Sequence, residues 1–328
     1  MGAAGRPVAA LPSRRGRRAA AVLASGDVTD VGPSWDGRGL PPAAVARLAR
    51  AKDSGVRTSL LAVDSQAGLD TAGFAPVGEV MGSAVLHLGW QGYAGCGWYG
   101  GGMGGFSMPF QVSTQVAAPG SGLAFAPYLD ALDAGWKTAI GRMLAEARAL
   151  GADGIVGVRL SEDRFEQGNR EFLALGTAVR SLGQVHTNRP FATTLGGSDL
   201  AKLLRAGWVP AAVMVCLSLG IRHDDFRTRQ STFWSAGNIE VPGYTDLVTT
   251  VREANRRQIS LRCAELGADG AVLTSPMRIQ IEELEVGEGH TDHAAIASCI
   301  ATALATFGDK SASSRSLVVL PLNGKGPR

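Results

Sequence analysis

The feature of this sequence that most constrains its fold is an internal repeat. Three blocks occur twice in the same order: residues 72–77 return at 206–211, residues 150–154 at 266–270, and residues 176–179 at 301–304. The middle block, Leu-Gly-Ala-Asp-Gly, is identical in its two places, while the spacings are 134, 116 and 125 residues. An ordered series with unequal spacing is typical of duplication followed by changes in loop length. The sequence therefore predicts two diverged tandem copies of one small unit.

Each copy has the same predicted order of elements: a short helix, a strand, a long helix and two further strands. The long helices are expected over residues 128–150 and 244–266, where apolar side chains recur every three or four positions. The expected strands are apolar runs at 77–88, 155–160 and 172–179 in the first copy, and at 211–221, 271–273 and 296–304 in the second. The predicted fold class is α+β, with each copy a small antiparallel sheet packed on one long helix.

The ends of the short helices are also predicted from side-chain chemistry. Ser198 is expected to cap the short helix of the second copy, and Asp64 stands at the corresponding place in the first. Gly73 and Gly207 follow these helices, where glycine adopts the left-handed conformation that ends a helix.

The identical block has a predicted structural role as a turn. Gly151 and Gly267 are expected to end the long helices. Asp153 and Asp269 are expected to accept hydrogen bonds from nearby backbone amides and so fix the turn into the next strand.

The run from Glu146 to Arg159, a helix ending in Leu-Gly-Ala-Asp before a valine-rich strand, closely resembles the signature of the YbjQ-like (UPF0145) family. Members of this family are often described as heavy-metal-binding domains. The resemblance covers residues 57–182 and 191–307. It implies a dodecin-like topology of strand, helix and two strands, and assembly into rings, with pentamers implied for single-domain members.

The second copy departs from the family pattern. Leu273-Thr274-Ser275-Pro276 replaces the expected Val-Gly-Val, and a proline there must end or bulge the strand because it lacks an amide donor. Ala301 replaces the glycine of the last strand. Any family site that depends on those glycines is expected to be lost from the second copy.

Composition and boundaries indicate a soluble two-domain protein. The predicted parts are a flexible basic tail at 1–35, the first copy at 36–185 with an insert at 89–106, the second copy at 190–308, and a carboxy-terminal tail at 309–328. Hydrophobic residues make up 45% and charged residues 19%, and the net charge of +3 does not favour nucleic-acid binding. There is no apolar run long enough for a membrane span. The four cysteines are widely spaced, which favours buried thiols and a cytoplasmic protein.

The insert in the first copy is rich in glycine and aromatic residues. Such a segment suits an interface loop, a pore-lining loop or a lid over a ligand, with low-complexity disorder as the alternative. The candidate contact residues are Trp90, Tyr93, Cys96, Trp98 and Tyr99. No phosphate-binding motif occurs there.

A second candidate site is a group of ligand-type side chains near the end of the second copy. Glu288, His290, Asp292 and His293 could bind a divalent metal if they converge, and the alternative is a polar loop between two strands. His87 and His223 lie near the ends of matching strands and are expected to be surface residues.

No catalytic motif is found, so the chain is not expected to be an enzyme. The leading hypothesis is a non-enzymatic homo-oligomer, ring-shaped by the family resemblance, with a ligand- or metal-binding role. One alternative is a heavy-metal-binding module that uses His, acidic or Cys residues of the second copy. The other is a small-molecule binder or enzyme gated by the glycine-aromatic loop.

Overall fold

The computed structural model describes residues 35–55, 59–90, 114–121, 123, 125–165, 168–232, 237–285 and 291–307. Two compact units are present, residues 1–46 and residues 47–328. Helix α2 covers Pro42–Ser54, and the other elements described here belong to the larger unit. We call residues 59–182 the first half and residues 191–307 the second half.

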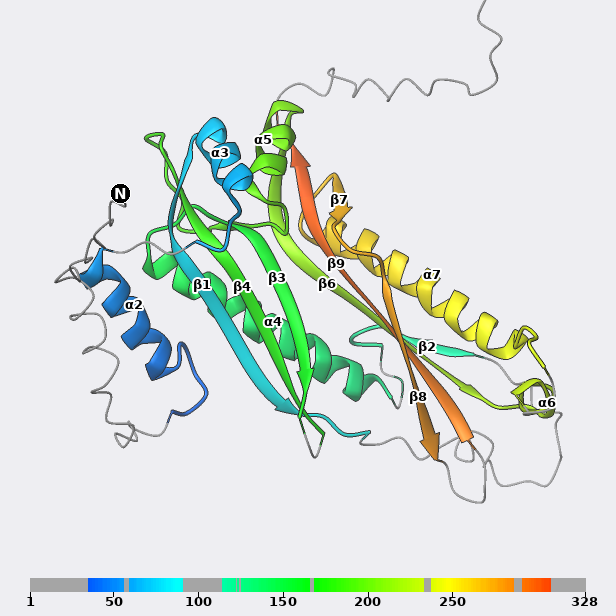
Figure 1. Cartoon of the computed structure of the whole chain (residues 1–328). Coiled ribbons are helices and arrows are strands. Elements are labelled where there is room, and N and C mark those ends of the chain that lie inside the picture. Colours follow the sequence, from blue (N-terminus) through cyan, green and yellow to red (C-terminus); the bar gives the residue numbers. More distant parts are fainter. Residues whose placement is uncertain are drawn as a thin grey trace, which may run out of the picture. The chain divides into compact units, whose positions relative to one another are not determined.

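The two halves have the same principal order of elements (Figure 1). The first half contains α3 (Val63–Ala72), β1 (Phe74–His87), β2 (Gln115–Ala117), α4 (Ala126–Ala149), β3 (Gly154–Arg164) and β4 (Asn169–Ser181). The second half contains β5 (Phe191–Ala192), α5 (Gly197–Arg205), β6 (Trp208–His223), α6 (Phe226–Thr232), α7 (Pro242–Glu265), β7 (Gly270–Leu273), β8 (Arg278–Glu285) and β9 (Thr291–Thr306). The predicted α+β fold class is confirmed, and each predicted strand and long helix is present with somewhat wider bounds.

The sheets of the two halves also have corresponding strand orders. In the first sheet the order is β1-β4-β3-β5, and in the second it is β2-β6-β9-β7, with β8 also paired to β9. In each half the first long strand therefore pairs antiparallel with the last strand, which in turn pairs with the strand that follows the long helix.

Each half contributes a short strand to the sheet of the other. Strand β5 of the second half pairs in parallel with β3. Strand β2 of the first half pairs antiparallel with β6. These strands of two and three residues were not predicted, because so short a segment carries no periodicity of its own.

The halves share a hydrophobic core. Helix α4 packs on β1 and β4 of its own sheet and also contacts β6 of the other half. Buried side chains of α4, such as Leu129 and Met143, therefore belong to one cluster with Leu217 and Leu219 of β6. Helix α7 packs on β6 and β9 (Figure 1). Helix α4 therefore packs on its own sheet, as predicted, and also on β6 of the other half.

The predicted caps of the short helices are also wrong. Helix α5 begins at Gly197 after Gly196, and α3 begins after Ala62, so Ser198 and Asp64 lie inside their helices. The reason is the close packing of α3 on α5. The amide of Gly197 donates to Ser65 Oγ at 2.6 Å, and a Cβ on Gly197 would lie 2.0 Å from the Ser65 carbonyl oxygen. Tertiary packing thus sets where α5 begins.

Two glycine and proline predictions agree with the structure. Gly73 and Gly207 have left-handed φ values of 76° and 81° after their helices. In the second half the strand is interrupted around Pro276, since β7 ends at Leu273 and β8 begins at Arg278. The first half keeps one continuous β3, with an irregularity in its pairing at Gly157.

Candidate functional site

The identical Leu-Gly-Ala-Asp-Gly blocks form the same turn in both halves. Gly151 and Gly267 have left-handed φ values of 68° and 63°. Asp153 Oδ2 accepts a hydrogen bond from the amide of Ser181 at 2.9 Å, and Asp269 Oδ2 accepts one from the amide of Thr306, also at 2.9 Å. Each aspartate therefore holds the last residue of the last strand of its own half.

Asp153 also contacts two residues beyond the end of β4. Its Oδ1 accepts the amide of Thr187 at 2.8 Å, and its Oδ2 lies 2.9 Å from His186 Nδ1. Burial acts to raise the pKa of Asp153, but the hydrogen bonds from His186, Thr187 and Ser181 outweigh burial and lower it.

A threonine anchors the segment before the first helix of each half. The amide of Leu60 donates to Thr177 Oγ1 at 3.0 Å, and the amide of Thr194 donates to Thr302 Oγ1 at 3.0 Å. One residue later, Leu61 and Leu195 donate their amides to the side chains of Ser59 and Thr193. Residues 59–61 and 193–195 therefore make the same set of local contacts.

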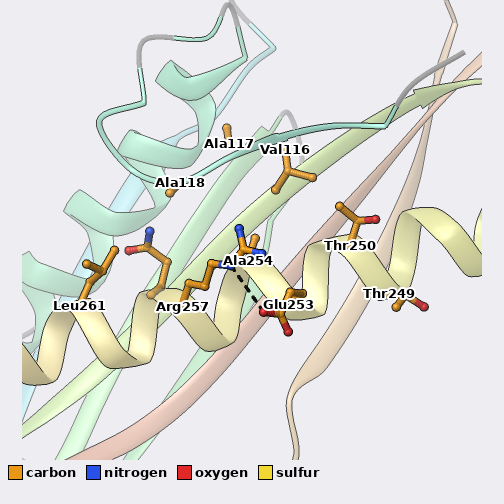
Figure 2. A pocket seen from close by; sticks show the side chains of 10 residues that line it. Val116, Ala117, Ala118, Thr249, Thr250, Glu253, Ala254, Arg257 and Leu261 are labelled. Carbon is orange, nitrogen blue, oxygen red and sulfur yellow. Dashed lines mark ion pairs between the residues drawn. The ribbon is translucent and has the colours of Figure 1, made fainter. Parts of the chain in front are cut away.

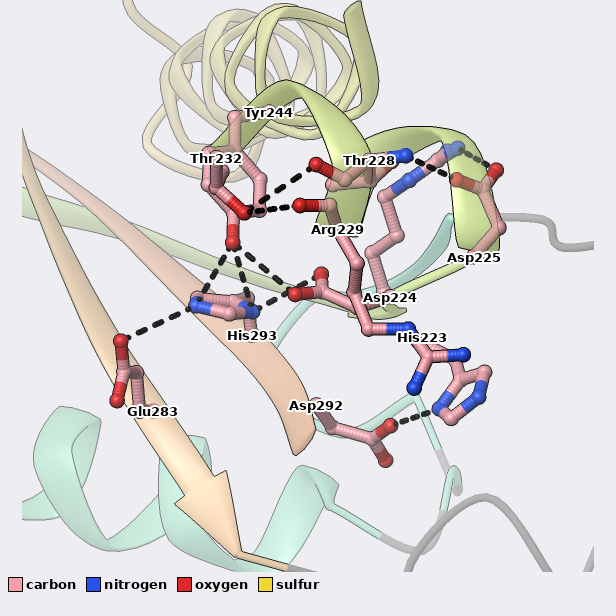
Figure 3. A network of polar contacts seen from close by, with 11 residues as sticks. His223, Asp224, Asp225, Thr228, Arg229, Thr232, Tyr244, Glu283, Asp292 and His293 are labelled. Atoms are coloured by element: carbon pink, nitrogen blue, oxygen red, sulfur yellow. Dashed lines mark hydrogen bonds and ion pairs between the residues drawn. The ribbon is translucent and has the colours of Figure 1, made fainter. Parts of the chain in front are cut away.

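A polar network joins the ends of β6 and β9 (Figure 3). His223 Nδ1 lies 2.7 Å from Asp292 Oδ1, and His293 Nδ1 lies 3.1 Å from Asp224 Oδ1. Residues 223 and 292 are directly paired between the strands. Tyr244 donates its hydroxyl proton to Asp224 at 3.1 Å. Burial and the charge of Asp224 raise the pKa of Tyr244, so the phenol stays protonated at neutral pH.

The His293 side of this network is a cluster of hydrogen-bonded polar side chains. His293 Nδ1 faces Asp224 and its Nε2 lies 3.5 Å from Glu283, so each ring nitrogen faces a carboxylate. A metal-bound imidazole needs one nitrogen free to coordinate. Among the residues that the structure describes, no group of three or more His, Cys, Asp or Glu side chains has the arrangement of a metal site.

The predicted metal ligands are only partly placed by the structure. Asp292 and His293 are neighbours in β9 and contact different partners, His223 and Asp224 respectively. Glu288 and His290 lie outside the described residues. His87 lies at the end of β1, where its Nδ1 is 3.2 Å from Asn169 Oδ1.

Of the predicted loop residues, only Trp90 lies within the described part of the chain; Tyr93, Cys96, Trp98 and Tyr99 lie outside it. The Trp90 ring stacks on Tyr128, with centroids 4.1 Å apart and planes inclined by 5°. The start of the insert is thus held against α4.

Tyr128 connects this aromatic contact to a network of charges between the halves. Its hydroxyl accepts a hydrogen bond from buried Arg170, which also bonds Glu162 at 2.7 Å and Glu282 of β8 at 3.3 Å. Burial, followed by the charge of Glu282, raises the pKa of Tyr128 to about 12. This network ties β3, β4 and α4 of the first half to β8 of the second.

A groove of about 490 Å³ lies between β2 and α7 (Figure 2). Its walls are residues 116–118 on one side and a face of α7 from Thr249 to Leu261 on the other. The charged groups in it are Glu253 and Arg257, which pair with each other at 3.4 Å. The lining offers an apolar surface but no convergent set of polar groups that would select a ligand.

Sequence reasoning missed one arrangement, a cluster of sulfur-bearing side chains under α7. Cys216 of β6 and Cys299 of β9 are directly paired between the strands, and Cys263 of α7 belongs to the same buried cluster. Their wide spacing in the sequence gave no motif. One signal could have found them. Cys216 and Cys299 lie in the two strands that the repeat predicts to pair with each other, as β1 and β4 do in the first half.

Part of this chain matches the YbjQ family. Residues 121–181 match the family described as "Putative heavy-metal-binding". UPF0145 proteins of Psychrobacter arcticus and Pseudothermotoga lettingae are 42% and 45% identical over 55 and 53 residues. Those matches cover 17% and 16% of this chain, and 35% and 50% of the relatives. No solved structure matches the chain.

One relative matches the chain over a much longer stretch. The chain is 34% identical over 241 residues to a Mycobacterium tuberculosis protein named "Encapsulin nanocompartment protein Rv1762c". The match covers 71% of this chain and 81% of that protein. The chain therefore belongs to the same family as the mycobacterial protein. Among the described helices, none is both long and apolar enough to cross a lipid bilayer.

Proposed function

We propose that this chain is a non-enzymatic, self-assembling component of an encapsulin nanocompartment. The observation that carries the proposal is the match to the mycobacterial encapsulin nanocompartment protein, because it extends over both halves and not only over the YbjQ segment. As part of this proposal, the two halves are diverged copies of one unit and the chain works in the cytoplasm. The shared turn and threonine contacts support the duplication.

The junction between the halves suggests how two chains would associate. Residues 191–195 of the second half run along β3 of the first. The amides of Phe191 and Thr193 donate to the carbonyls of Asp153 and Ile155, and the carbonyl of Thr193 accepts the amide of Val158. This junction is built from backbone hydrogen bonds, so its geometry depends little on side-chain identity.

The chain also contains the two segments that would form an equivalent junction between neighbouring chains, residues 59–61 and β7. By the repeat spacing, residues 59–61 correspond to 193–195 and β7 corresponds to the start of β3. Within the described residues, β7 is an edge strand that pairs only with β9. Residues 59–61 already make the local contacts of their counterparts. We infer that they add to β7 of a neighbouring chain.

The exposure of side chains around β7 supports this inference. Val156 of β3 is fully buried, whereas its counterpart Val272 is only partly buried, and Leu273 beside it is 45% exposed. A head-to-tail contact uses two different surfaces, and it closes into a ring when the rotation between chains allows it.

The contact between short helices would not recur in the second junction. A Cβ on Gly68 would lie 2.3 Å from the backbone of Ser198, so this contact requires glycine in α3. The corresponding residue of α5 is the exposed Lys202, which is paired with Asp199. The contact between chains would therefore consist of strand addition alone, without the close packing that joins α3 and α5 within one chain.

The candidate sites of the sequence fit this proposal as secondary features. Trp90, which stacks on Tyr128, is a proposed contact for a ligand or a neighbouring chain. The predicted set of Glu288, His290, Asp292 and His293 remains a proposed divalent-metal site. Replacing His293 with alanine and measuring bound zinc tests it, and an unchanged metal content would argue against it.

The test of the nanocompartment role is co-production of the chain with an encapsulin shell protein. We expect the chain to elute with the shell in size-exclusion chromatography and to resist trypsin until the shell is disassembled. An unrelated soluble protein of similar mass, produced in the same way, controls for nonspecific trapping. Elution at the chain's own size, with full trypsin sensitivity, would contradict the proposal.

A further inference from the structure

Soft sulfur donors gather in one place in the second half. One buried cluster contains Met214, Cys216, Cys263 and Cys299, with Met277 packed against it, and we call these five residues the sulfur cluster. The chain has four cysteines in all, so three of them meet here. The other members of the cluster are small or aliphatic, such as Ala301, Ala303 and Ile259.

The backbone register brings the two central thiols together. Cys216 and Cys299 occupy directly opposed positions of β6 and β9, so their side chains emerge on the same face of the sheet. They are 1% and 2% exposed. Buried Asn255 of α7 donates to the carbonyl of Cys216 at 2.9 Å, which fixes the strand under the helix.

The third cysteine lies at the carboxyl end of α7. Cys263 is 8% exposed, and its Sγ lies 3.6 Å from the carbonyl oxygen of Gly270. Partly exposed neighbours, including Met277 and Ala268, cover the cluster on this side. The thiols therefore lie close beneath the molecular surface.

The donor set decides which kind of metal fits. The family description names heavy metals, yet residues 121–181, the segment matched by the family, contain neither cysteine nor histidine. Thiolate and thioether donors prefer soft ions such as Cu(I), whereas carboxylates prefer hard ions. The sulfur cluster contains only soft donors, so it fits a soft metal ion and does not fit magnesium or calcium.

We propose that Cys216 and Cys299 bind a soft, thiophilic metal ion of the Cu(I) class, with Cys263 and Met214 as neighbouring donors. This site lies outside the matched YbjQ segment and goes beyond the proposed assembly role. Two thiolates are enough for a linear, two-coordinate ion, so the site does not require a group of three ligands.

Binding exchanges protons for the metal. Each coordinating thiol forms one sulfur–metal bond and releases its proton to solvent, so a Cu(I) ion bound by two thiolates carries one net negative charge.

The test uses the reduced full-length chain without air and Cu(I) supplied as its complex with bicinchoninic acid. We expect the wild-type chain to withdraw one Cu(I) from the chelator. The double variant Cys216→Ala and Cys299→Ala should bind at least ten-fold more weakly. Cys96→Ala, which removes the fourth cysteine of the sequence, and His293→Ala, which removes the alternative ligand, should both bind like the wild type.

A second measurement does not depend on the double variant being folded. X-ray absorption at the copper edge of the loaded Cys96→Ala chain should show sulfur donors alone. The proposal is overturned if the wild type withdraws no Cu(I), or if copper is coordinated by nitrogen or oxygen. It is also overturned if His293→Ala or Cys96→Ala abolishes binding, or if the folded double variant binds as tightly as the wild type.

Discussion

The turn aspartates allow one prediction to be worked out in detail, because the same residue has different surroundings in the two halves. Asp153→Asn keeps the size of the side chain but removes its charge and one acceptor oxygen. In the folded chain the Asp153 carboxylate accepts two backbone amides and faces His186. Hydrogen bonds to a charged group contribute about 1.5–3 kcal/mol each, and they are not additive. We expect Asp153→Asn to lower the free energy of unfolding by about 3 kcal/mol at pH 7.

The corresponding change in the second half should cost less. Asp269 is exposed, and it accepts hydrogen bonds from the amide and hydroxyl of Thr306 at the end of β9. Water replaces such contacts more easily, so Asp269→Asn should cost about 1 kcal/mol. Urea unfolding followed by circular dichroism measures both variants against the wild type, with unchanged m-values as the control for an unchanged transition.

The pH dependence checks the physical cause. The pKa of folded Asp153 lies below its ordinary value of 3.8. Its contribution is therefore fully present above that value and is lost as pH falls through the folded pKa. The difference between the wild type and Asp153→Asn should shrink as pH is lowered from 5 to about 2. A difference that does not change with pH, or equal costs for the two aspartates, would refute this reasoning.

Three further predictions concern packing and the contacts between the halves. Gly82→Ala in β1 should lower the free energy of unfolding in urea by several kcal/mol, because its Cβ would lie 2.0 Å from a carbonyl oxygen of α4. Gly141→Ala lies in open space on α4 and should raise that free energy by about 1 kcal/mol. Equal effects of the two variants would contradict this. Arg170→Ala removes the cation bound to Glu162 and the donor to the Tyr128 hydroxyl, while Glu282 keeps Arg164, and it should cost about 3 kcal/mol. A loss below about 1 kcal/mol would mean that the network is not buried as described. Thr302→Val should cost about 1–2 kcal/mol and increase amide exchange at Thr194, and unchanged exchange would count against that anchor.

The order of elements could be predicted because it depends on local chemistry. Apolar residues at helical spacing predicted α4 and α7, glycine predicted where they end, and Pro276 predicted the break between β7 and β8. Each of these signals acts through a few neighbouring residues, so no knowledge of the partner segments was needed.

The contacts between halves could not be predicted in the same way. The side of α4 that meets Leu217 and Leu219 has the same apolar character as the side that meets its own sheet. Cys216, Cys263 and Cys299 come together only through strand register and helix packing. The caps of α3 and α5 were displaced because the close contact at Gly197 overrides the local preference of Ser198.

The measurement that most directly tests assembly through β7 is native mass spectrometry of the full-length chain at micromolar concentration. We predict a closed oligomer for the wild type and monomer for Leu273→Lys, since a charged side chain on the edge strand disfavours strand addition. Leu266→Lys is the matched control, because Leu266 is 47% exposed, as Leu273 is 45% exposed, but lies at the end of α7 outside the strand. It should keep the oligomer intact. A monomeric wild type, or an oligomer that Leu273→Lys leaves unchanged, would contradict the account.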